Sequence, residues 1–330
     1  MTGKIRIGIA GYGNLGRGAE LAVQQNRDME LIAVFTRRDP KLINVNTSTT
    51  KVLPLAQAEK MINEIDVMIL CSGSAKDLPQ QGPYLAQMFN TVDSFDTHAK
   101  IPEYFEAVDK AAQKGKKTGI ISIGWDPGLF SLQRMLADAV LPQGKEYTFW
   151  GRGVSQGHSD AIRKVPGVKY GVQYTIPKED AVARVRKGET PELSARDKHL
   201  RQCFVVAEEG ADKDKIAAAI KSMPNYFAEY ETHVFFITEE QFKQDHVKMP
   251  HGGFVLRNGV TGIKQEHKQL MEFSLKLESN PEFTASVLVA YARAAYRLQQ
   301  EGQYGAKTIF DIPLAYISPR SPEDLRKEFL

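Results

Sequence analysis

Cysteine is scarce in this sequence, with Cys71 and Cys203 the only two among 330 residues. Their spacing matches no metal-binding pattern, and two distant cysteines cannot form a disulfide framework. We therefore expect buried thiols, no bound metal and a reducing compartment. We also expect no signal peptide, because Arg6 and the glycines that follow it interrupt the first apolar stretch. These absences favour a cytoplasmic protein.

Charge of one sign and long apolar runs are scarce as well. The 43 Lys and Arg residues against 40 Asp and Glu residues leave a net charge of +3, too small for a surface that binds a phosphate backbone. No segment approaches the roughly 20 apolar residues that a membrane span requires. We therefore expect neither nucleic acid nor a membrane as a partner. The composition, 42% hydrophobic and 25% charged, is that of a folded chain, and the length predicts about two domains.

The first third of the chain alternates short apolar runs with helix-like stretches. This pattern is typical of parallel strands joined by crossover helices. The expected strands are residues 5–10, 31–35, 67–70, 91–95 and 119–123. Each run ends in small, polar or charged residues, and open α/β sheets bind ligands at the carboxyl ends of their strands. The five strand ends are therefore predicted to converge on one crevice.

Further along, the apolar runs become longer and predict a second kind of sheet. The expected strands there are residues 168–176, 202–207, 232–237 and 270–277, mostly antiparallel, with a helix at 213–223 between two of them. Gln173, Thr175, Glu272 and Lys276 alternate with apolar neighbours. This alternation predicts a sheet with one face in water.

Gly11, Gly13 and Gly16 form the pattern G-x-G-x-x-G directly after the first expected strand and at the head of a helical pattern. The first glycine allows a tight turn, the second lets the backbone approach a pyrophosphate, and the third lets helix and strand pack closely. The helix N-terminus adds free amides and the positive end of a dipole. Glycines also mark ordinary turns, but this setting predicts a dinucleotide cofactor. The predicted fold class is α/β, with a Rossmann-type parallel-sheet domain and a second α+β domain that has a mostly antiparallel sheet.

The second strand ends in Thr36, Arg37 and Arg38, where an NAD site would carry an acidic residue for the ribose hydroxyls. Two guanidinium groups at this point suit the 2′-phosphate of NADP. The alternative is a solvated turn, from which Asp39 could reach a ribose. The position at a strand end favours NADP over NAD.

Seven short runs are more specific than a fold. They are GYGNLG at 11–16, FTRR at 35–38, GWDPG at 124–128, FWG at 149–151, SQGHSD at 155–160, MPHGG at 249–253 and NPEFT at 280–284. Together they resemble the meso-diaminopimelate dehydrogenase family, in order and over nearly the whole chain. SQGHSD and MPHGG are not general features of dinucleotide-binding proteins.

The resemblance implies an activity and a domain plan. The family's reaction is the NADP-dependent, reversible oxidative deamination of the D-centre of meso-2,6-diaminopimelate to L-2-amino-6-oxopimelate, ammonia and NADPH, within lysine and diaminopimelate metabolism. The implied assembly is a homodimer. The implied domains are a dinucleotide-binding domain at 1–125 and a substrate-binding and dimerisation domain at 126–282. A helix is expected from 283 to 300, and the segment from about 283 to 330 is expected to pack back on the first domain.

The resemblance also implies a cofactor site at the strand ends. Its expected residues are Gly11, Tyr12, Gly13, Asn14, Leu15, Gly16, Thr36, Arg37, Arg38, Cys71, Ser72, Gly73, Ser74, Ser94, Phe95, Asp96, Ile123, Gly124, Trp125, Asp126 and Pro127.

For the substrate, Asp96 and Asp126 are implied as the catalytic pair that holds the reacting amino group and helps to remove its proton. Trp125 and Trp150 are implied as walls that exclude water. His158 is a weaker candidate for an acid or base. Lys100 receives no role.

The distal L-centre of the substrate is implied to bind Thr175, Arg201, His251 and Asn280, with Arg201 able to hold a carboxylate bidentately. Gln156, Gly157 and Asp160 are implied to form a loop over the reacting end. Gly252 and Gly253, next to His251, are expected where backbone packs closely around a ligand.

Three alternatives remain open from the residues alone. One is another two-domain dehydrogenase, such as a dihydrodipicolinate reductase or a homoserine dehydrogenase, which would not explain SQGHSD and MPHGG. A second is a D-amino-acid dehydrogenase of broad scope, which would leave the polar residues of the distal site unpaired. A third is a non-catalytic NADP-sensing regulator, which would need no charged substrate pocket.

Overall fold

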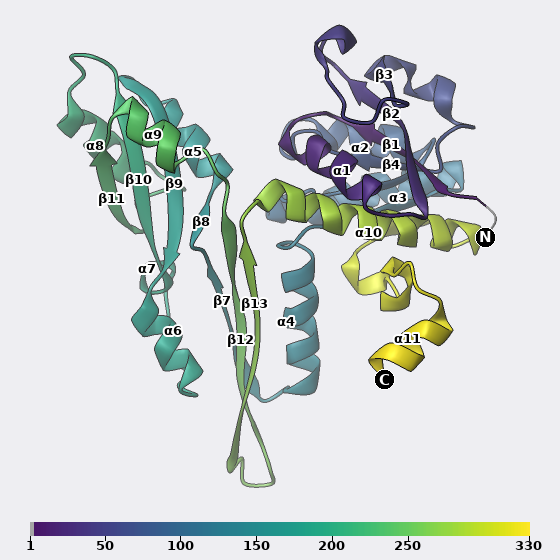
Figure 1. Cartoon of the computed structure of the whole chain (residues 1–330). Coiled ribbons are helices and arrows are strands. Elements are labelled where there is room, and N and C mark those ends of the chain that lie inside the picture. The colour runs from purple at the N-terminus through teal and green to yellow at the C-terminus, as the bar shows by residue number, and fades with distance from the viewer. Residues whose placement is uncertain (1–2) are drawn as a thin grey trace. The chain divides into compact units, whose positions relative to one another are not determined.

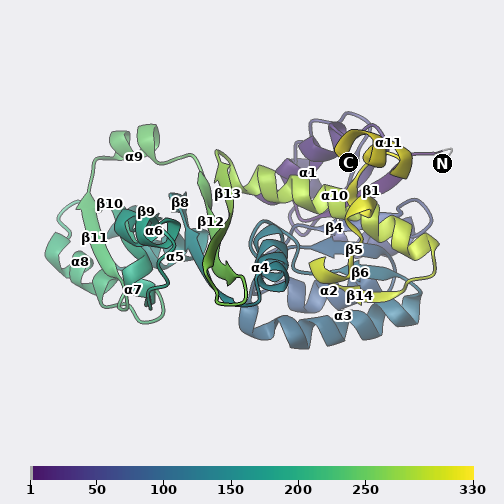
Figure 2. The same cartoon turned by 90° about the horizontal axis from the view of Figure 1, so that it is seen from below.

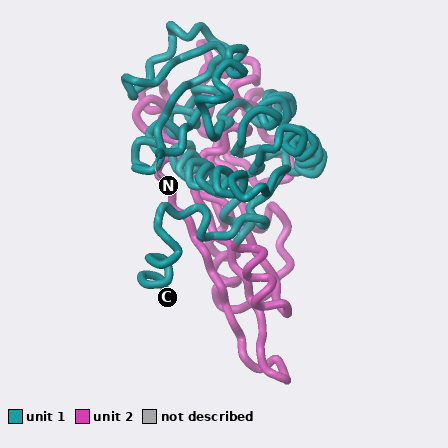
Figure 3. Tube along the Cα trace, turned by 90° about the vertical axis from the view of Figure 1, so that its right-hand side faces the viewer, with its two compact units in different colours: residues 1–132, 281–330 teal, residues 133–280 magenta. Residues whose placement is uncertain are grey.

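The computed structural model describes residues 3–330. The chain divides into two compact units, one of Met1–Leu132 with Pro281–Leu330 and one of Gln133–Asn280 (Figure 3). The domain boundaries predicted from the sequence were 125/126 and 282/283. Among residues 3–330, no helix combines the length and the apolar content that crossing a membrane requires.

The first unit is built on a parallel sheet of seven strands. In spatial order these are β14 (Gly305–Lys307), β6 (Thr118–Ile120), β5 (Asn90–Asp93), β4 (Val67–Leu70), β1 (Ile5–Ala10), β2 (Met29–Thr36) and β3 (Lys51–Pro54). Every neighbouring pair is parallel, as predicted. Two strands, β3 and β14, add to the five expected.

Helices cover both faces of this sheet (Figure 2). One apolar layer joins the sheet to α1 (Asn14–Gln24) and α10 (Asn280–Gln300), and includes the buried Val289 and Leu298. The other joins it to α2 (Leu78–Ala86) and α3 (Ile101–Gly115). The expected helix at 283–300 is α10, which starts three residues earlier.

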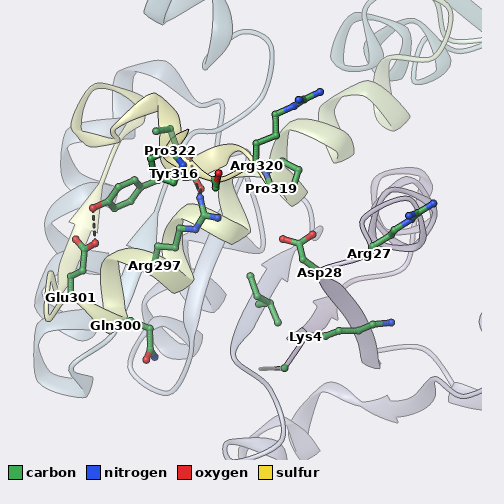
Figure 4. A pocket seen from close by; sticks show the side chains of 14 residues that line it. Lys4, Arg27, Asp28, Arg297, Gln300, Glu301, Tyr316, Pro319, Arg320 and Pro322 are labelled. Carbon is green, nitrogen blue, oxygen red and sulfur yellow. Dashed lines mark hydrogen bonds between the residues drawn. The ribbon is translucent and has the colours of Figure 1, made fainter. Parts of the chain in front are cut away.

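Arg293 and Arg297 of α10 bind carbonyls of the C-terminal segment, which carries α11 (Pro322–Phe329); Figure 4 shows Arg297. Arg293, only 1% exposed, donates to both carboxylate oxygens of Asp28 at 2.6 and 2.8 Å. Arg297 Nη1 donates to the carbonyls of Ala315, Tyr316 and Ser318. A cavity of about 870 Å³ lies here. Arg297, one of the cations that line this cavity, is thus used to satisfy backbone carbonyls.

The second unit contains two sheets (Figure 1). One has the order β13 (His267–Leu277), β12 (His251–Thr261), β7 (Gly144–Trp150), and the other the order β11 (Glu231–Phe236), β10 (His199–Ala207), β9 (Val168–Pro177), β8 (Gly153–Val154). All pairs are antiparallel except β10 with β11, which are connected through α8 (Lys213–Lys221). The remaining helices are α4 (Leu129–Val140), which begins in the first unit, α5 (Gln156–Arg163), α6 (Glu179–Arg186), α7 (Ala195–Lys198) and α9 (Glu239–Asp245). The predicted fold class is confirmed.

One expectation about the second unit is wrong. Gln173 and Thr175 do not face water, since they are 0% and 4% exposed. Strand β9 is an inner strand, and its polar side chains lie beside those of β10 instead of alternating with solvent. Glu272 and Lys276 on the edge strand β13 are exposed, as predicted.

Candidate active site

The carboxyl ends of five parallel strands are linked by hydrogen bonds, and the N–H of Ile123 after β6 donates to the carbonyl of Asp93 at the end of β5. The backbone N–H of Gly11 donates to the carbonyl of Phe35, and that of Cys71 donates to the carbonyl of Ala10. Asp96 N–H donates to Ser74 Oγ at 2.9 Å. The predicted cofactor residues of β1, β2, β4 and β5 therefore lie along one edge of the sheet.

The glycine turn has the geometry that a phosphate group needs. Gly11 has φ of 98°, and a Cβ on Gly16 would lie 2.2 Å from the Gly11 carbonyl oxygen. A Cβ on Gly13 would meet nothing within 4 Å. No side chain caps the N-terminus of α1 through a hydrogen bond, and its first turn carries no acidic residue. An anion at this point meets the positive end of the helix dipole with no competing carboxylate.

The two arginines after β2 have different partners. Arg37 donates to both oxygens of Asp77 at 2.8 and 2.7 Å, and Asp77 also accepts the N–H of Gly73. Arg38 donates to the carbonyl of Tyr12 at 2.5 Å. Asp77 was not singled out in the sequence, where nothing marks it as the partner of Arg37. The pair ties the end of β2 to the loop after β4.

Tyr12 is fixed by a buried carboxylate that the sequence did not single out. Glu20 of α1 is 0% exposed and accepts from the Tyr12 hydroxyl and from the N–H of Thr47. Burial followed by the hydrogen bond to Glu20 raises the pKa of Tyr12. This hydroxyl therefore acts as a permanent donor that holds the residue between two glycines of the turn.

Asp96 and Asp126 follow the ends of β5 and β6. Asp96 is exposed, and Asp126 is half-buried in a turn closed by a bridge between Trp125 and Gly128. Gly128 is required in this turn, because its φ is 129° and a Cβ would lie 1.9 Å from the carbonyl oxygen of Gly124. Trp125 is 7% exposed and packs edge-to-face on Phe130. Both aspartates thus belong to the linked strand ends of the first unit.

In the second unit, Arg201 and Thr175 are direct cross-strand partners of β10 and β9. Arg201 Nη1 and Gln173 Nε2 both donate to the hydroxyl oxygen of Thr175. A hydroxyl has two acceptor positions and one hydrogen, so the Thr175 O–H is left to point at a further acceptor. The buried atoms Arg201 Nε and Gln173 Oε1 have no hydrogen-bond partner among the described residues.

Arg201 is a buried cation without an acidic partner. It is 7% exposed, and within residues 3–330 no carboxylate forms an ion pair with it. Burial lowers the pKa of Arg201, and its guanidinium lies 3.9 Å from the centre of the Tyr230 ring. An isolated buried charge is costly, so this arrangement indicates a site for an anionic ligand. Tyr230 has no signal in the sequence, because its contact depends on the fold.

Two histidines near Arg201 are kept neutral. Burial, followed by the charge of Arg201, lowers the pKa of His158 to about 4 and that of His199 to about 3. His158 Nδ1 lies 2.7 Å from Ser155 Oγ. His199 Nε2 accepts the backbone N–H of Trp150 at 2.8 Å, and the two rings stack with centroids 5.3 Å apart. His199 therefore sets the position of one predicted wall of the site.

His251 and Asn280 lie around the same strand ends. A Cβ on Gly153, which pairs with Thr175, would lie 2.4 Å from the His251 ring. The N–H of Asn280 donates to the carbonyl of Met249, and Gln156 Nε2 lies 3.2 Å from the sulfur of Met249. The second unit thus brings together Trp150, Gln156, Thr175, Arg201, His251 and Asn280.

One expectation about this unit is wrong in detail, and a second position has a cause within the sheet. Gly252 and Gly253 are explained by the sheet, since a Cβ on either would lie about 2 Å from a carbonyl oxygen of Leu275 or Phe149. Gln156, Gly157 and Asp160 lie in helix α5 and not in a loop. Asp160 pairs with Arg163 of the same helix, while Gly157 is exposed with open space beside it.

Comparison with known proteins identifies the family of this chain. Residues 124–279 match the family model described as the diaminopimelic acid dehydrogenase C-terminal domain. A meso-diaminopimelate D-dehydrogenase from Ureibacillus thermosphaericus is 67% identical over 327 residues, which is 99% of either chain. The match confirms the predicted family and does not support the alternatives.

Solved structures agree over the whole chain. The diaminopimelate dehydrogenase of Corynebacterium glutamicum, in complex with diaminopimelate, is 44% identical, with a TM-score of 0.92 and coverage of 100% of both chains. An engineered D-amino acid dehydrogenase bound to NADP⁺ is 42% identical, with a TM-score of 0.86 over 99% of this chain and 100% of that one. The chain therefore belongs to the family of meso-diaminopimelate D-dehydrogenases, which are oxidoreductases.

Proposed function

We propose that the chain catalyses the NADP-dependent, reversible oxidative deamination of the D-centre of meso-2,6-diaminopimelate to L-2-amino-6-oxopimelate, ammonia and NADPH. The observation that carries this proposal is Arg201, a buried cation with no acidic partner within residues 3–330, beside the unbonded amide oxygen of Gln173. A substrate whose far end bears a carboxylate and an ammonium supplies an acceptor for Arg201 and a donor for Gln173. D-alanine, whose side chain is a methyl group, would leave both buried groups unpaired.

The chain's own residues fit NADP. The open space at Gly13 and the uncapped N-terminus of α1 suit a pyrophosphate, and Arg37 and Arg38 supply the charge for a 2′-phosphate. When bound, the cofactor supplies the acceptor for a hydride. Asp77 stabilises Arg37 as a bidentate partner, which leaves the outer face of the exposed guanidinium for the phosphate. We assign to cofactor binding all 21 positions at the strand ends that the family resemblance implies.

At the reacting end, Asp96 and Asp126 are proposed to bind the ammonium of the D-centre. A carboxylate stabilises the ammonium and accepts a proton from the nitrogen before it can lose a hydride from the neighbouring carbon. Trp125 and Trp150 exclude water, the first through burial on Phe130 and the second through its stack on His199. His158 is neutral and engaged with Ser155, so the aspartate pair is the better assignment for proton transfer.

At the distal end, Arg201 is proposed to hold the carboxylate of the L-centre, with the hydroxyl hydrogen of Thr175 as a further donor. His251 and Asn280 complete this end. Gln156, Gly157 and Asp160, which lie in α5, are proposed to contact the reacting end. The charged distal pocket is what separates the proposed activity from that of a general D-amino-acid dehydrogenase.

The experiment follows NADP reduction at alkaline pH with meso-diaminopimelate, its LL isomer, D-alanine and homoserine in parallel. We expect reduction with the meso isomer and less than about 1% of that rate with the others, because D-alanine leaves the buried polar groups of the distal end unpaired and the LL isomer has no D-centre to react. Equal rates with D-alanine would overturn the proposal. NAD in place of NADP serves as the cofactor control.

We also propose that the chain acts as a homodimer in the cytoplasm. Strand β13, 11 residues long, lies at the edge of its sheet, and Met135, Leu136 and Val140 of α4 are 43–58% exposed. Long edge strands and exposed apolar side chains are normally covered. A reducing compartment suits the buried, unbridged Cys71 and Cys203. Sedimentation at micromolar concentration is expected to give twice the 36.9 kDa of one chain, and Leu136→Asp to shift it toward one chain.

A further inference from the structure

A buried carboxylate that the proposed reaction does not use lies directly behind the catalytic strand ends. Asp93 is the last residue of β5, is 1% exposed and, within residues 3–330, forms no ion pair with a cation. A buried carboxylate is costly unless its oxygens are fully hydrogen-bonded. Both carboxylate oxygens of Asp93 accept hydrogen bonds from the residues around it.

Asp93 bonds to two different strand ends at once. Its Oδ1 accepts the backbone N–H of Phe95 at 2.9 Å and that of Ser122 at 3.1 Å. Its own carbonyl accepts the N–H of Ile123 at 2.8 Å. The β5–β6 ladder ends at Val92 and Ile120, so the carbonyl and the side chain of Asp93 together connect the two segments beyond it.

The second oxygen of Asp93 is held from the other side. Its Oδ2 accepts the hydroxyl of Tyr104 from α3 at 2.7 Å. Tyr104 is 4% exposed, and its ring stacks on that of Phe95 at 4.2 Å between centroids. A Cβ on Gly82 of α2 would lie 2.0 Å from the Tyr104 hydroxyl, so this hydroxyl is tightly enclosed. Burial raises the pKa of Tyr104, which therefore stays a donor.

The two segments that Asp93 joins are those that carry the proposed chemistry. Phe95 precedes Asp96, and Ser122 and Ile123 precede the turn that holds Trp125 and Asp126. Ser122 has φ of 57°, a left-handed conformation that a non-glycine residue keeps only when its surroundings impose it. The hydrogen bond from its N–H to Asp93 is such a restraint.

We propose that Asp93, backed by Tyr104, is a positioning residue that fixes the backbone of both segments and thereby sets the placement of Asp96 and Asp126. This inference rests on the proposed function for its activity readout. Asp93 contacts neither substrate nor cofactor in this role. It acts through Oδ1, which accepts both backbone N–H groups, while Oδ2 accepts the Tyr104 hydroxyl.

Because Asp93 is titratable, its restraint on the two strand ends is expected to depend on pH. Burial raises the pKa of Asp93 to about 6, while the bonds from Tyr104, Phe95 and Ser122 act against that rise. Tyr104 is the titratable group that faces it, and the Ser122 hydroxyl beside it is neutral. When Asp93 takes up a proton, one oxygen becomes a donor that opposes the Tyr104 hydroxyl. We expect the restraint on both strand ends to weaken as a result.

The test compares pH profiles of kcat/KM for reductive amination in the wild type, Asp93→Asn and Tyr104→Phe. Asparagine mimics the protonated acid, so Asp93→Asn is expected to lose about tenfold at pH 8 and to show no inflection near pH 6. Tyr104→Phe keeps the ring but removes a bond that lowers the Asp93 pKa, so its inflection is expected at higher pH. Asp109→Asn is the matched control, because Asp109 bonds the N–H of Ala306 away from the strand ends.

An unmoved inflection in Tyr104→Phe, or an Asp93→Asn profile that superimposes on the wild type, would overturn the proposal. A stability effect alone would lower the melting temperature without moving the inflection. Failure of the proposed function is recognised separately, since the wild type itself would then be inactive with meso-diaminopimelate. In that case the same proteins are compared by quenching of NADPH fluorescence across pH, where the same order of inflections is expected.

Discussion

Arg201 shows how one side chain can define a ligand. Its guanidinium is fixed between the Thr175 hydroxyl and the face of Tyr230, yet no acid of residues 3–330 pairs with it. Fixing a fork of donors before the ligand arrives reduces the entropy lost on binding. In the proposed function, the substrate supplies the carboxylate that Arg201 lacks.

Replacing Arg201 by Leu is expected to raise the KM for meso-diaminopimelate roughly 10- to 150-fold, since a hydrogen bond to a charged group contributes about 1.5–3 kcal/mol. The KM for NADP should stay within about twofold. Steady-state kinetics with each substrate varied in turn measures both values. Arg184→Leu is the control, because Arg184 forms an exposed pair with Glu189 in the same unit. An unchanged KM for the amino acid in Arg201→Leu would contradict the assignment.

A second prediction about single residues concerns the two arginines after β2. The double substitution of Arg37 and Arg38 by Ala removes the positive charge proposed to meet the 2′-phosphate. The ratio of kcat/KM for NADP to that for NAD is expected to fall at least about tenfold, the value of one charge-assisted bond. Arg17→Ala, on the exposed face of α1, should leave the ratio unchanged. If the double variant keeps its preference, the NADP assignment is wrong.

Among the elements, the turn between β1 and α1 contains glycines that are needed for two different reasons. At Gly16 the protein itself forbids a side chain, because a Cβ would lie 2.2 Å from a backbone oxygen. At Gly13 the protein leaves the space open. A requirement for glycine at position 13 would therefore come from the ligand.

Gly13→Ala is accordingly expected to keep the melting temperature within about 2 °C while raising the Kd for NADPH at least about tenfold, because the methyl group occupies the path of the pyrophosphate. Gly16→Ala should lower both stability and affinity. Calorimetry and fluorescence titration measure the two quantities, with Gly3→Ala as a control for an open glycine elsewhere. Unchanged affinity in Gly13→Ala would place the cofactor away from this turn.

The elements that could be predicted from the sequence are those with a strong local pattern. Strand β1 and the apolar strand β4 were predicted with the bounds that the structure has. Strand β14 is three residues long and has no periodicity, and β12 contains three glycines that read as turns. Both exist because neighbouring strands complete them, which is a property of the fold and not of the segment.

The same limit applies to the site. Glycines, strand-end arginines and family motifs mark positions that a sequence can reveal. Gln173, Tyr230 and Asp93 have no such mark, because each matters through a partner brought close by strand register or by a helix packed across the sheet. Gln173 was even predicted to face water, since alternation alone cannot tell an inner strand from an exposed one.

For the whole molecule, the buried histidines predict how stability depends on pH. His158 and His199 are neutral in the folded state, with pKa values of about 4 and about 3, while the unfolded chain takes up their protons near pH 6.5. The unfolded state therefore binds more protons in this range, and the free energy of unfolding falls as the pH drops from 6.5 toward 4. The contribution of Asp93 to the free energy of unfolding changes in the opposite direction, because its folded pKa of about 6 lies above its unfolded value. The two histidines lower the free energy of unfolding and Asp93 raises it, so the net result is a fall.

Urea unfolding between pH 4.5 and 8 is expected to show this fall, by at most about 1.4 kcal/mol per pH unit for each histidine. His199→Gln should flatten the curve below pH 6.5, since its amide does not titrate. His267→Asn, on an exposed side chain, should leave the slope unchanged. A wild-type stability that is level from pH 6.5 to 5 would show that these histidines are protonated in the folded protein.

The first unit is assembled from two separated stretches of chain, and this has a consequence during synthesis. Strand β14 and most of helix α10 emerge from the ribosome only after the entire second unit has been made. Until then the nascent sheet ends at β6 and exposes the apolar surface that Val289 and Leu298 later cover. A fragment limited to the first 132 residues is thus expected to aggregate, and nascent chains of the full protein to depend on chaperones until translation ends.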